Sequence, residues 1–319
     1  MIKISNISYY FPQKSLSNAD LEKEFPEWSA VKIEEKVGIK NRFIVDENVT
    51  ALDLAENACN KLFENYEKSK IDFVLLCTQS PDYFLPTSAC ILQDKLHLSK
   101  NIGALDFNLG CSGFVYGLAV AKGLISANIA KNVLLVTSET YSKHLDKKDK
   151  ANRSIFGDGA CATVVEKDSK GFNYEFSLGT DGSGYDNLIV KNGAFKCSKN
   201  ESEDDFLYMN GPEIFNFTIE NIPNLVKETI SNNKLTENDI DFYIFHQANT
   251  FMLNYLRKKC KISEEKFYID MENYGNTVSS TIPIALKDCI ENKLVKKGDK
   301  ILIAGFGVGY SWGATIIEI

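Results

Sequence analysis

The sequence is poor in the features that mark several classes of protein. It contains only three histidines, and none has a second ligand at the spacing of a zinc site, so we expect no metal and no other cofactor. The longest uncharged stretch, 301–317, is interrupted by glycines and is typical of strand–turn–strand rather than of a bilayer helix. The N-terminus lacks the long apolar core of a signal peptide. We therefore expect a cytoplasmic protein that does not bind a membrane.

Positive charge is also scarce. The 319-residue chain has a formal net charge of -7 and a pI near 5.2, which argues against a nucleic-acid-binding protein. An acidic partner would therefore need a local basic patch. Hydrophobic residues make up 44% and charged residues 25%, which excludes a disordered chain or a coiled coil. The eight cysteines are scattered without a C-x-x-C pair, which indicates reduced thiols that mostly pack as small hydrophobic residues.

The chain carries an internal repeat. Three segments of the first half recur in the same order in the second half, two at nearly constant separation and the third at a smaller one, which implies a shorter preceding connection. The pairs are 71–77 with 240–246, 132–136 with 300–304, and 159–166 with 313–318. Chance similarity of short apolar strands is the alternative, but the common order favours duplication. We expect two copies of one unit, 1–168 and 169–319.

Helical and strand patterns alternate within each half. Helices are expected at 51–66, 112–127, 216–232 and 279–291, and strands at 71–77, 132–139, 240–245, 300–306 and 313–319. Thr50 is a candidate N-cap of the first helix. The alternation predicts α/β architecture with mostly parallel sheets. Two sheets packed through the apolar helices would give a five-layer α/β/α/β/α body. The segment 191–205 is the one polar, loop-like excursion.

Three polar side chains stand where strands of the repeat end. Cys111 lies between a strand and an apolar helix, His246 ends a strand, and Asn276 precedes a helix. Ligands of parallel α/β sheets gather at this edge, so the two halves can bring the three residues together. We expect the helix N-terminus to lower the pKa of the Cys111 thiol. Taken singly, each residue could be merely structural; together they indicate covalent thioester chemistry.

Glycines alternate with other residues over 305–309, just after an apolar strand. The pattern fits neither phosphate-binding loop motif and predicts a tight hairpin. Glycines also allow backbone N–H groups to approach a substrate carbonyl, as in an oxyanion hole.

Several ordered motifs resemble those of one enzyme family. They are 37–39 (VGI), 109–114 (LGCSGF), 156–160 (FGDGA), 246–249 (HQAN), 275–277 (GNT) and 307–313 (GVGYSWG). On these residues the chain is similar to the β-ketoacyl-acyl-carrier-protein synthases III of the thiolase superfamily, and the resemblance runs nearly the whole length. It implies a thiolase-like, duplicated five-layer α/β/α/β/α fold and a homodimer.

The resemblance implies a two-stage reaction. Cys111 would take an acyl group from acyl-CoA or acyl carrier protein, with the oxyanion held by backbone N–H groups of Cys111 and of the turn Gly307, Val308 and Gly309. His246 Nε2 and Asn276 Nδ2 would then stabilise the enolate formed when a malonyl thioester loses CO₂. Phe306 would crowd the departing carboxylate.

The resemblance also implies binding residues. Trp28 and Lys36 would bind CoA, with either Lys150 or Arg153 holding a phosphate and Asn249 near the pantetheine amides. A carrier-protein patch would lie at Arg257, Lys258 and Lys259, although charge runs are usually solvated helix faces.

The sequence departs from the typical member at three positions. Phe251 replaces a carrier-docking arginine, Gly110 replaces an alanine, and Leu85 replaces a phenylalanine that closes the acyl pocket from the partner subunit. A smaller residue at Leu85 would admit a longer or branched acyl group. Two alternatives stay open. One is acyl transfer to a hydroxyl or amine without carbon–carbon bond formation, and the other is a silent scaffold.

Overall fold

The computed structural model describes residues 1–196 and 205–319. The polar segment expected over 191–205 is therefore described only at its two ends, because 197–204 lie outside the described residues. Among the residues described, no helix is long and apolar enough to cross a membrane.

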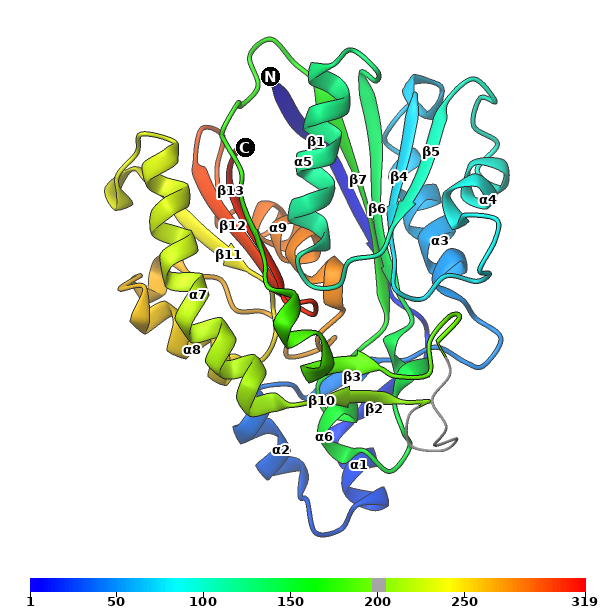
Figure 1. Cartoon of the computed structure of the whole chain (residues 1–319), viewed down its shortest axis with the longest axis vertical. Helices are drawn as coiled ribbons and strands as arrows, with labels where there is room; N and C mark the ends of the chain where they lie inside the picture. Colours follow the sequence, from blue (N-terminus) through cyan, green and yellow to red (C-terminus); the bar gives the residue numbers. More distant parts are fainter. Residues whose placement is uncertain (197–204) are drawn as a thin grey trace.

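Two β-sheets form the body of the molecule (Figure 1). The five-stranded sheet has the order β1-β7-β6-β4-β5: β1 (Ile2–Tyr10), β7 (Gly159–Lys167), β6 (Asn132–Glu139), β4 (Phe73–Cys77) and β5 (Gly103–Phe107). The four-stranded sheet has the order β8-β13-β12-β11: β8 (Ser177–Thr180), β13 (Ser311–Glu318), β12 (Lys300–Gly307) and β11 (Phe242–Phe245). The first sheet draws only on residues before 168 and the second only on residues after 169.

The prediction of mostly parallel sheets was wrong. Pairings β4–β5, β4–β6 and β11–β12 are parallel, whereas β1–β7, β6–β7, β12–β13 and β13–β8 are antiparallel. For β12 and β13 the physical reason is connection length. A turn as short as 308–310, between β12 and β13, can only return the chain antiparallel, whereas parallel neighbours need a crossover.

Helices cover the sheets in layers, as the expected thiolase-like α/β/α/β/α fold requires. Helices α5 (Gly113–Ser126) and α9 (Thr281–Glu291) lie between the two sheets, and their apolar residues pack on both. Helices α3 (Ala51–Phe63) and α4 (Ser88–Lys95) cover the outer face of the first sheet, and α7 (Gly211–Asn232) and α8 (Thr250–Lys259) flank the second. One continuous core runs through both halves.

Short elements form a small unit at one end of the body, which the sequence patterns did not reveal. They are β2 (Ser15–Ser17), α1 (Asn18–Glu24), α2 (Ala30–Val37), β3 (Asn41–Phe43) and α6 (Lys150–Arg153). A separate pair, β9 (Leu188–Val190) and β10 (Leu207–Met209), flanks the segment that is not described.

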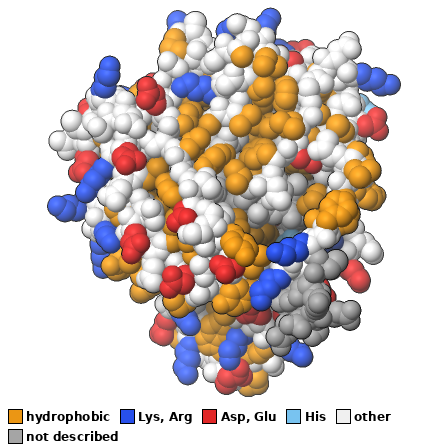
Figure 2. Space-filling view, in the orientation of Figure 1, with side chains coloured by type: hydrophobic (Ala, Val, Ile, Leu, Met, Phe, Trp, Pro, Cys, Tyr) orange, Lys and Arg blue, Asp and Glu red, His pale blue; other side chains and the backbone are white. Residues whose placement is uncertain are grey.

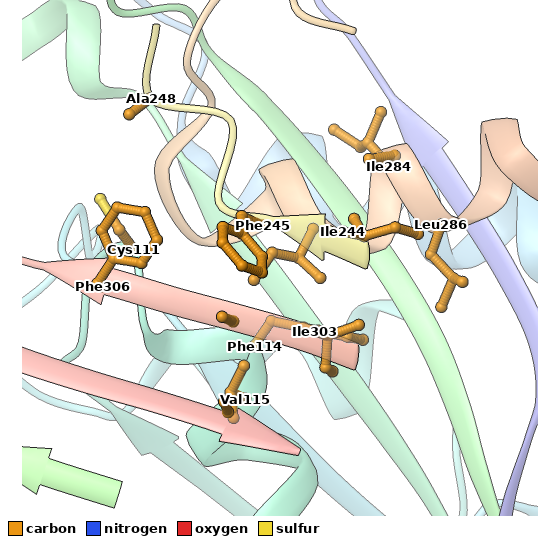
Figure 3. Packing of buried hydrophobic residues seen from close by; sticks show 14 of the residues in the cluster. Cys111, Phe114, Val115, Ile244, Phe245, Ala248, Ile284, Leu286, Ile303 and Phe306 are labelled. Carbon is orange, nitrogen blue, oxygen red and sulfur yellow. The ribbon is translucent and has the colours of Figure 1, made fainter. Parts of the chain in front are cut away.

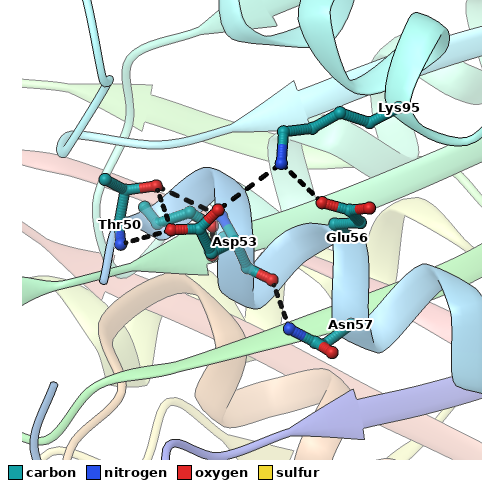
Figure 4. A network of polar contacts seen from close by, with 7 residues as sticks. Thr50, Asp53, Glu56, Asn57 and Lys95 are labelled. Carbon is teal, nitrogen blue, oxygen red and sulfur yellow. Dashed lines mark hydrogen bonds and ion pairs between the residues drawn. The ribbon is translucent and has the colours of Figure 1, made fainter. Parts of the chain in front are cut away.

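The predicted N-cap of α3 is confirmed. The Thr50 hydroxyl accepts from Asp53 N–H, and the Asp53 carboxylate accepts from Thr50 N–H, which forms a capping box. Lys95 on α4 reaches both Asp53 and Glu56 (Figure 4). The contact joins two outer helices, and since these side chains are partly exposed it contributes little stability.

A buried carboxylate ties the central loops of the first half together. Asp158 is fully buried and accepts hydrogen bonds from Val45 N–H, Ser142 N–H and the Ser142 hydroxyl. We expect Asp158→Ala to lower the free energy of unfolding by about 3 kcal/mol or more, because buried donors lose their acceptor. Urea unfolding measures the change. Asp158→Asn is the matched control, since it keeps one acceptor oxygen and should lose less. A loss in Asp158→Ala below about 1 kcal/mol would contradict this view.

Candidate active site

Cys111 lies in the loop between β5 and α5, where strand β12 of the second half presses against it. A Cβ atom added at Gly307 would lie 3.0 Å from Cys111 Sγ, and one at Gly305 would lie 2.7 Å from Cys111 O. Only glycine permits so close an approach. Figure 3 shows the sulfur beside Phe306, between the loop and β12. The alternating glycines of β12 therefore bring the two halves together at the sulfur.

The thiol environment differs from the expectation. Cys111 is only 6% exposed, and burial, followed by the nearby Glu139 carboxyl, raises the pKa of its thiol to about 12. The residue's own N–H acts in the opposite direction. The prediction of a lowered pKa was wrong, because removing the thiolate from water outweighs the helix N-terminus. In the resting protein, Cys111 is a thiol at neutral pH.

His246 is placed by β11 and held by α9. Its backbone N–H donates to Ala304 O of β12 at 2.8 Å, and its Nδ1 lies 2.7 Å from Thr281 Oγ1. The side chain is 2% exposed, and burial lowers the pKa of the imidazole to about 3. The ring is therefore neutral at physiological pH. The Phe306 ring meets it edge-on, with centroids 5.7 Å apart.

Asn276 is fixed by contacts from both halves. Its backbone N–H donates to Ile155 O at 2.9 Å, and Gly157 N–H donates to Asn276 O at 3.0 Å. Val278 N–H donates to Asn276 Oδ1 at 2.9 Å, which turns Nδ2 toward His246 Nε2, 3.5 Å away. Val278 has φ of 56°, an unusual conformation for a β-branched residue. This strained turn orients the carboxamide.

The hydroxyl of Thr281 controls which nitrogen of His246 carries the proton. Thr281 Oγ1 lies 2.7 Å from His246 Nδ1 and 3.1 Å from Val278 O. Its single proton can be donated to only one of them. When Thr281 donates to Nδ1, the imidazole proton resides on Nε2; when it donates to Val278, the proton resides on Nδ1. Sequence reasoning missed Thr281, since only folding brings it to His246.

Two backbone N–H groups near the sulfur are free. Within the described part of the chain, neither Cys111 N–H nor Val308 N–H donates to a protein acceptor. The turn that carries Val308 is held by Ser311 Oγ, which donates to Val308 O at 3.0 Å and lies 2.6 Å from Ser112 Oγ. The free donors suit an oxyanion.

The predicted CoA residues form a cluster on the small terminal unit. Lys36 Nζ lies 5.7 Å and Lys150 Nζ 5.9 Å from the Trp28 ring centroid. Arg153 instead makes a bidentate ion pair with Glu24, at 2.6 and 3.1 Å. Lys36 and Lys150 are therefore the cations beside Trp28, and Lys150 also pairs with Glu27 at 2.6 Å.

Asn249 stands at the start of α8, three residues after His246. Its side chain caps the helix by accepting from Met252 N–H at 2.8 Å. The Asn249 side-chain oxygen is thus already engaged, and its amide nitrogen is left for other contacts.

The predicted carrier-protein patch is only partly open. Arg257 has a side chain 14% exposed and pairs with Glu264 at 3.4 Å, so it does not belong to an open patch. Lys258 and Lys259 are exposed. Phe251 is exposed and lies in an aromatic cluster with Phe215.

Leu85 lies far out on the surface of a single chain. It is 79% exposed, and its neighbours Tyr83 and Phe84 are exposed as well. It therefore does not help to bury Cys111 of its own chain. Among the described residues, no group of three or more His, Cys, Asp or Glu side chains could hold a metal ion.

Family models match two parts of the chain. The model of 3-oxoacyl-[acyl-carrier-protein (ACP)] synthase III matches residues 105–182, and the model of the C-terminal part of the same proteins matches residues 230–319. The first contains Cys111, and the second contains His246 and Asn276.

Full-length relatives carry the same name. A beta-ketoacyl-[acyl-carrier-protein] synthase III from Fusobacterium nucleatum is 36% identical, over 99% of this chain and 98% of the relative. One from Clostridium perfringens is 38% identical, over 99% of both chains.

Solved structures agree closely with the fold. A crystal structure of 3-oxoacyl-(acyl-carrier-protein) synthase III is 44% identical, covers 100% of this chain and 99% of its own, and has a TM-score of 0.98. A beta-ketoacyl-[acyl carrier protein] synthase III from Thermus thermophilus is 32% identical over 99% of both chains, with a TM-score of 0.92.

Proposed function

Because the chain belongs to the 3-oxoacyl-[acyl-carrier-protein] synthase III family, we propose that Cys111, His246 and Asn276 form its reaction centre. The chain is a condensing acyltransferase of thiolase fold, which joins an acyl group to a malonyl unit. The observation that supports the assignment is that β12 meets Cys111 through Gly307 and His246 through Phe306. Two adjacent residues of β12 thus contact the nucleophile Cys111 and the imidazole of His246. The imidazole in turn lies beside the Asn276 amide.

In the first half-reaction, Cys111 Sγ attacks the thioester carbon of an acyl donor. The new S–C bond forms as the donor's S–C bond breaks, and the Cys111 proton passes to the departing thiolate. The oxyanion is bound by Cys111 N–H and Val308 N–H. His246 serves as the proton carrier when Thr281 donates to Val278, because Nε2 then has a free lone pair.

In the second half-reaction, a malonyl thioester loses CO₂, and its electron pair passes into an enolate. Asn276 Nδ2 donates to the enolate oxygen. His246 Nε2 donates to the same oxygen in the other tautomer, which forms when Nδ1 gives up its proton to solvent, Nε2 takes one up, and Thr281 turns to donate to Nδ1. A neutral imidazole suits this task, since it stabilises negative charge without protonating the carbanion early. The carbanion then attacks the acyl-Cys111 carbonyl, the C–S bond breaks, and Cys111 leaves as a thiolate, which takes up a proton from solvent to regain the resting thiol. Phe306 provides an apolar surround for the malonyl carboxylate, which favours loss of that carboxylate as CO₂.

Release of CO₂ tests the proposal directly. Enzyme incubated with acyl-CoA and carboxyl-labelled malonyl-carrier protein is expected to release labelled CO₂ in step with β-ketoacyl product. Acyl transfer to a hydroxyl or amine would consume acyl-CoA without CO₂, so its observation would overturn the condensation. The relatives' names do not favour that alternative.

The CoA end of the donor fits the terminal unit. We propose that Trp28 stacks on the adenine while Lys36 and Lys150 bind the phosphates of CoA, because both ammonium groups lie beside the Trp28 ring, at 5.7 and 5.9 Å from its centroid. Asn249, between His246 and this unit, would bind the pantetheine amides.

The carrier protein would meet the exposed lysines of α8. Lys258→Glu with Lys259→Glu is expected to raise KM for malonyl-carrier protein about tenfold, and more at low salt, since rim charges act through steering. The measurement is steady-state condensation at two ionic strengths. Lys100→Glu with Lys131→Glu, at exposed positions just before β5 and β6, is the matched control with the same charge change. An unchanged KM in the double variant would contradict the proposal that Lys258 and Lys259 bind the carrier protein.

We propose a homodimer through β5, at the edge of the five-stranded sheet. Leu105 on β5 is exposed, as are Val120 and Leu178, and Figure 2 shows hydrophobic side chains gathered on the face that carries α5 and β5. An unpaired edge with apolar neighbours favours strand pairing with a second copy. Sedimentation should give twice the chain mass of 35.8 kDa, and Leu105→Asp should shift it toward the monomer.

A cytoplasmic location is consistent with the cysteines. All seven in the described residues are free thiols, and most are buried.

A further inference from the structure

The helix that begins just after the nucleophile lacks its expected cap. Ser112 stands at the N-cap position of α5, and serine is among the best capping residues. Its side chain nevertheless makes no hydrogen bond to the first turn of the helix. The hydroxyl lies instead 2.6 Å from Ser311 Oγ on β13. A local bond that would stabilise the helix is thus replaced by a bond between the two halves of the chain.

The direction of the hydrogen bonds follows from the number of protons. Val308 O can only accept, so Ser311 uses its single hydroxyl proton to donate to that oxygen at 3.0 Å. Ser112 must then donate to Ser311 Oγ. The three oxygens form a series in which each bond polarises the next. Because both serines are buried, water does not compete for these bonds.

The two ends of this series lie at the two free N–H groups beside the sulfur. Ser112 directly follows Cys111, and Val308 itself carries the second N–H group. Gly113 N–H donates to Gly110 O at 2.8 Å, which closes the turn that presents Cys111. The series therefore connects the turn of one donor to the residue that carries the other.

Packing holds the hairpin between β12 and β13 from two further sides. A Cβ atom added at Gly110 would lie 2.5 Å from Val308 Cγ1, closer than real Cβ atoms approach. The Val308 side chain thus already occupies the space that an alanine at position 110 would need. On the outer side, Tyr310 N–H donates to Asp181 O at 2.7 Å, and Asp181 N–H donates to Tyr310 O at 3.0 Å. The hairpin is fixed on these sides, and the serine pair ties it to the nucleophile turn.

We propose that Ser112 and Ser311 are positioning residues that hold the two oxyanion donors at a fixed separation. The inference rests on the proposed function, in which Cys111 N–H and Val308 N–H bind the oxyanion. An oxyanion hole works because its donors are already aimed at one oxygen before charge develops there. Such groups must be held within about 0.5 Å of the productive geometry. The serine pair supplies this restraint across the boundary between the halves.

The serine pair is expected to affect some steps of the reaction and not others. An oxyanion forms when Cys111 attacks the acyl donor and again when the carbanion attacks the acyl group, so both steps use the two donors. Loss of CO₂ from the malonyl unit develops its charge at His246 and Asn276 instead. Loading that slows while decarboxylation persists would therefore separate this role from general damage to the fold.

Loading of Cys111 tests the proposal. Ser112→Ala, Ser311→Ala and the double variant of the full-length enzyme are mixed with acetyl-CoA at several concentrations, and intact-protein mass spectrometry follows the acyl adduct over time. Each single change is expected to slow loading about tenfold with an unchanged half-saturating concentration of acetyl-CoA, less than the loss of a whole donor would. The double variant should be no slower than the slower single variant, because the serines act as one unit.

Two further variants separate the hydroxyl from the fold. Ser311→Thr keeps the hydroxyl on a strand, where β-branched side chains fit, and should recover most of the rate lost in Ser311→Ala. Ser138→Ala removes another buried hydroxyl, which donates to Ala51 O of α3 at 2.6 Å, and should leave loading unchanged. Release of CO₂ from malonyl-carrier protein without an acyl donor should stay within about twofold of normal in every variant.

Several results would overturn the assignment. One is loading within about twofold of normal in both single alanine variants. Another is a loss in the double variant equal to the product of the single losses, which would make the serines independent. A parallel fall in CO₂ release, or Ser311→Thr as slow as Ser311→Ala, would also contradict it. An unmodified enzyme that forms no acyl adduct would instead overturn the proposed function itself, so the two failures are distinguishable.

Discussion

Replacing Cys111 with alanine is expected to abolish acyl-enzyme formation and β-ketoacyl synthesis. The neighbouring Cys77 cannot take over, because it is fully buried and its thiol donates a hydrogen bond to Leu109 O at 3.0 Å. The loss should exceed about 10⁴-fold, which is typical for removal of a covalent nucleophile. Intact-protein mass spectrometry after exposure to acetyl-CoA measures the adduct, and product assays measure the synthesis.

Two controls separate chemistry from structure. Cys111→Ser keeps the shape but offers a weaker nucleophile, so it should show slow loading at best. Decarboxylation of malonyl-carrier protein should outlast the loss of the sulfur in Cys111→Ala, since His246 and Asn276 remain. An acyl adduct on Cys111→Ala would disprove the assignment of the nucleophile.

The second large effect is expected at Asn276. Asn276→Ala should still load an acyl group on Cys111 but lose condensation by about 10²–10³-fold, because a single donor to a developing oxyanion is worth that much. His246→Ala should likewise keep acylation and lose condensation. Single-turnover acylation by mass spectrometry and CO₂ release from malonyl-carrier protein measure the two steps separately.

Asn276→Asp distinguishes donation from positioning. The carboxylate keeps an oxygen for Val278 N–H but has no Nδ2 donor, so the turn should persist while condensation is lost. If Asn276→Asp or Asn276→Ala condensed at the normal rate, the enolate role would be wrong.

The internal repeat carries most of what the sequence predicts about the site. Segments 71–77 and 240–246 become the equivalent strands β4 and β11, each beside the equivalent strand β6 or β12. Residues that follow such strands meet at one edge, so His246 and Asn276 could be named from the pattern. Apolar runs also predict α5 and α9 nearly to their observed ends.

Other features depend on contacts that no local pattern records. Thr281 is distant in sequence from His246, and Ser311 is distant from Ser112, so each pair exists only after folding. Hydrophobic periodicity does not record the direction of a strand, which is why the mixed sheets were missed. The burial of Cys111 arises from β12, which crosses the helix N-terminus and removes the solvent that a thiolate would need.

The buried, protonated state of Cys111 affects its reaction with oxidants and alkylating reagents. Hydrogen peroxide and alkylating reagents attack thiolates far faster than thiols. A cysteine whose pKa is near 12 presents almost no thiolate in the absence of substrate. The resting enzyme therefore resists oxidation of Cys111 to sulfenic acid. The sulfur becomes nucleophilic only once an acyl thioester lies against it.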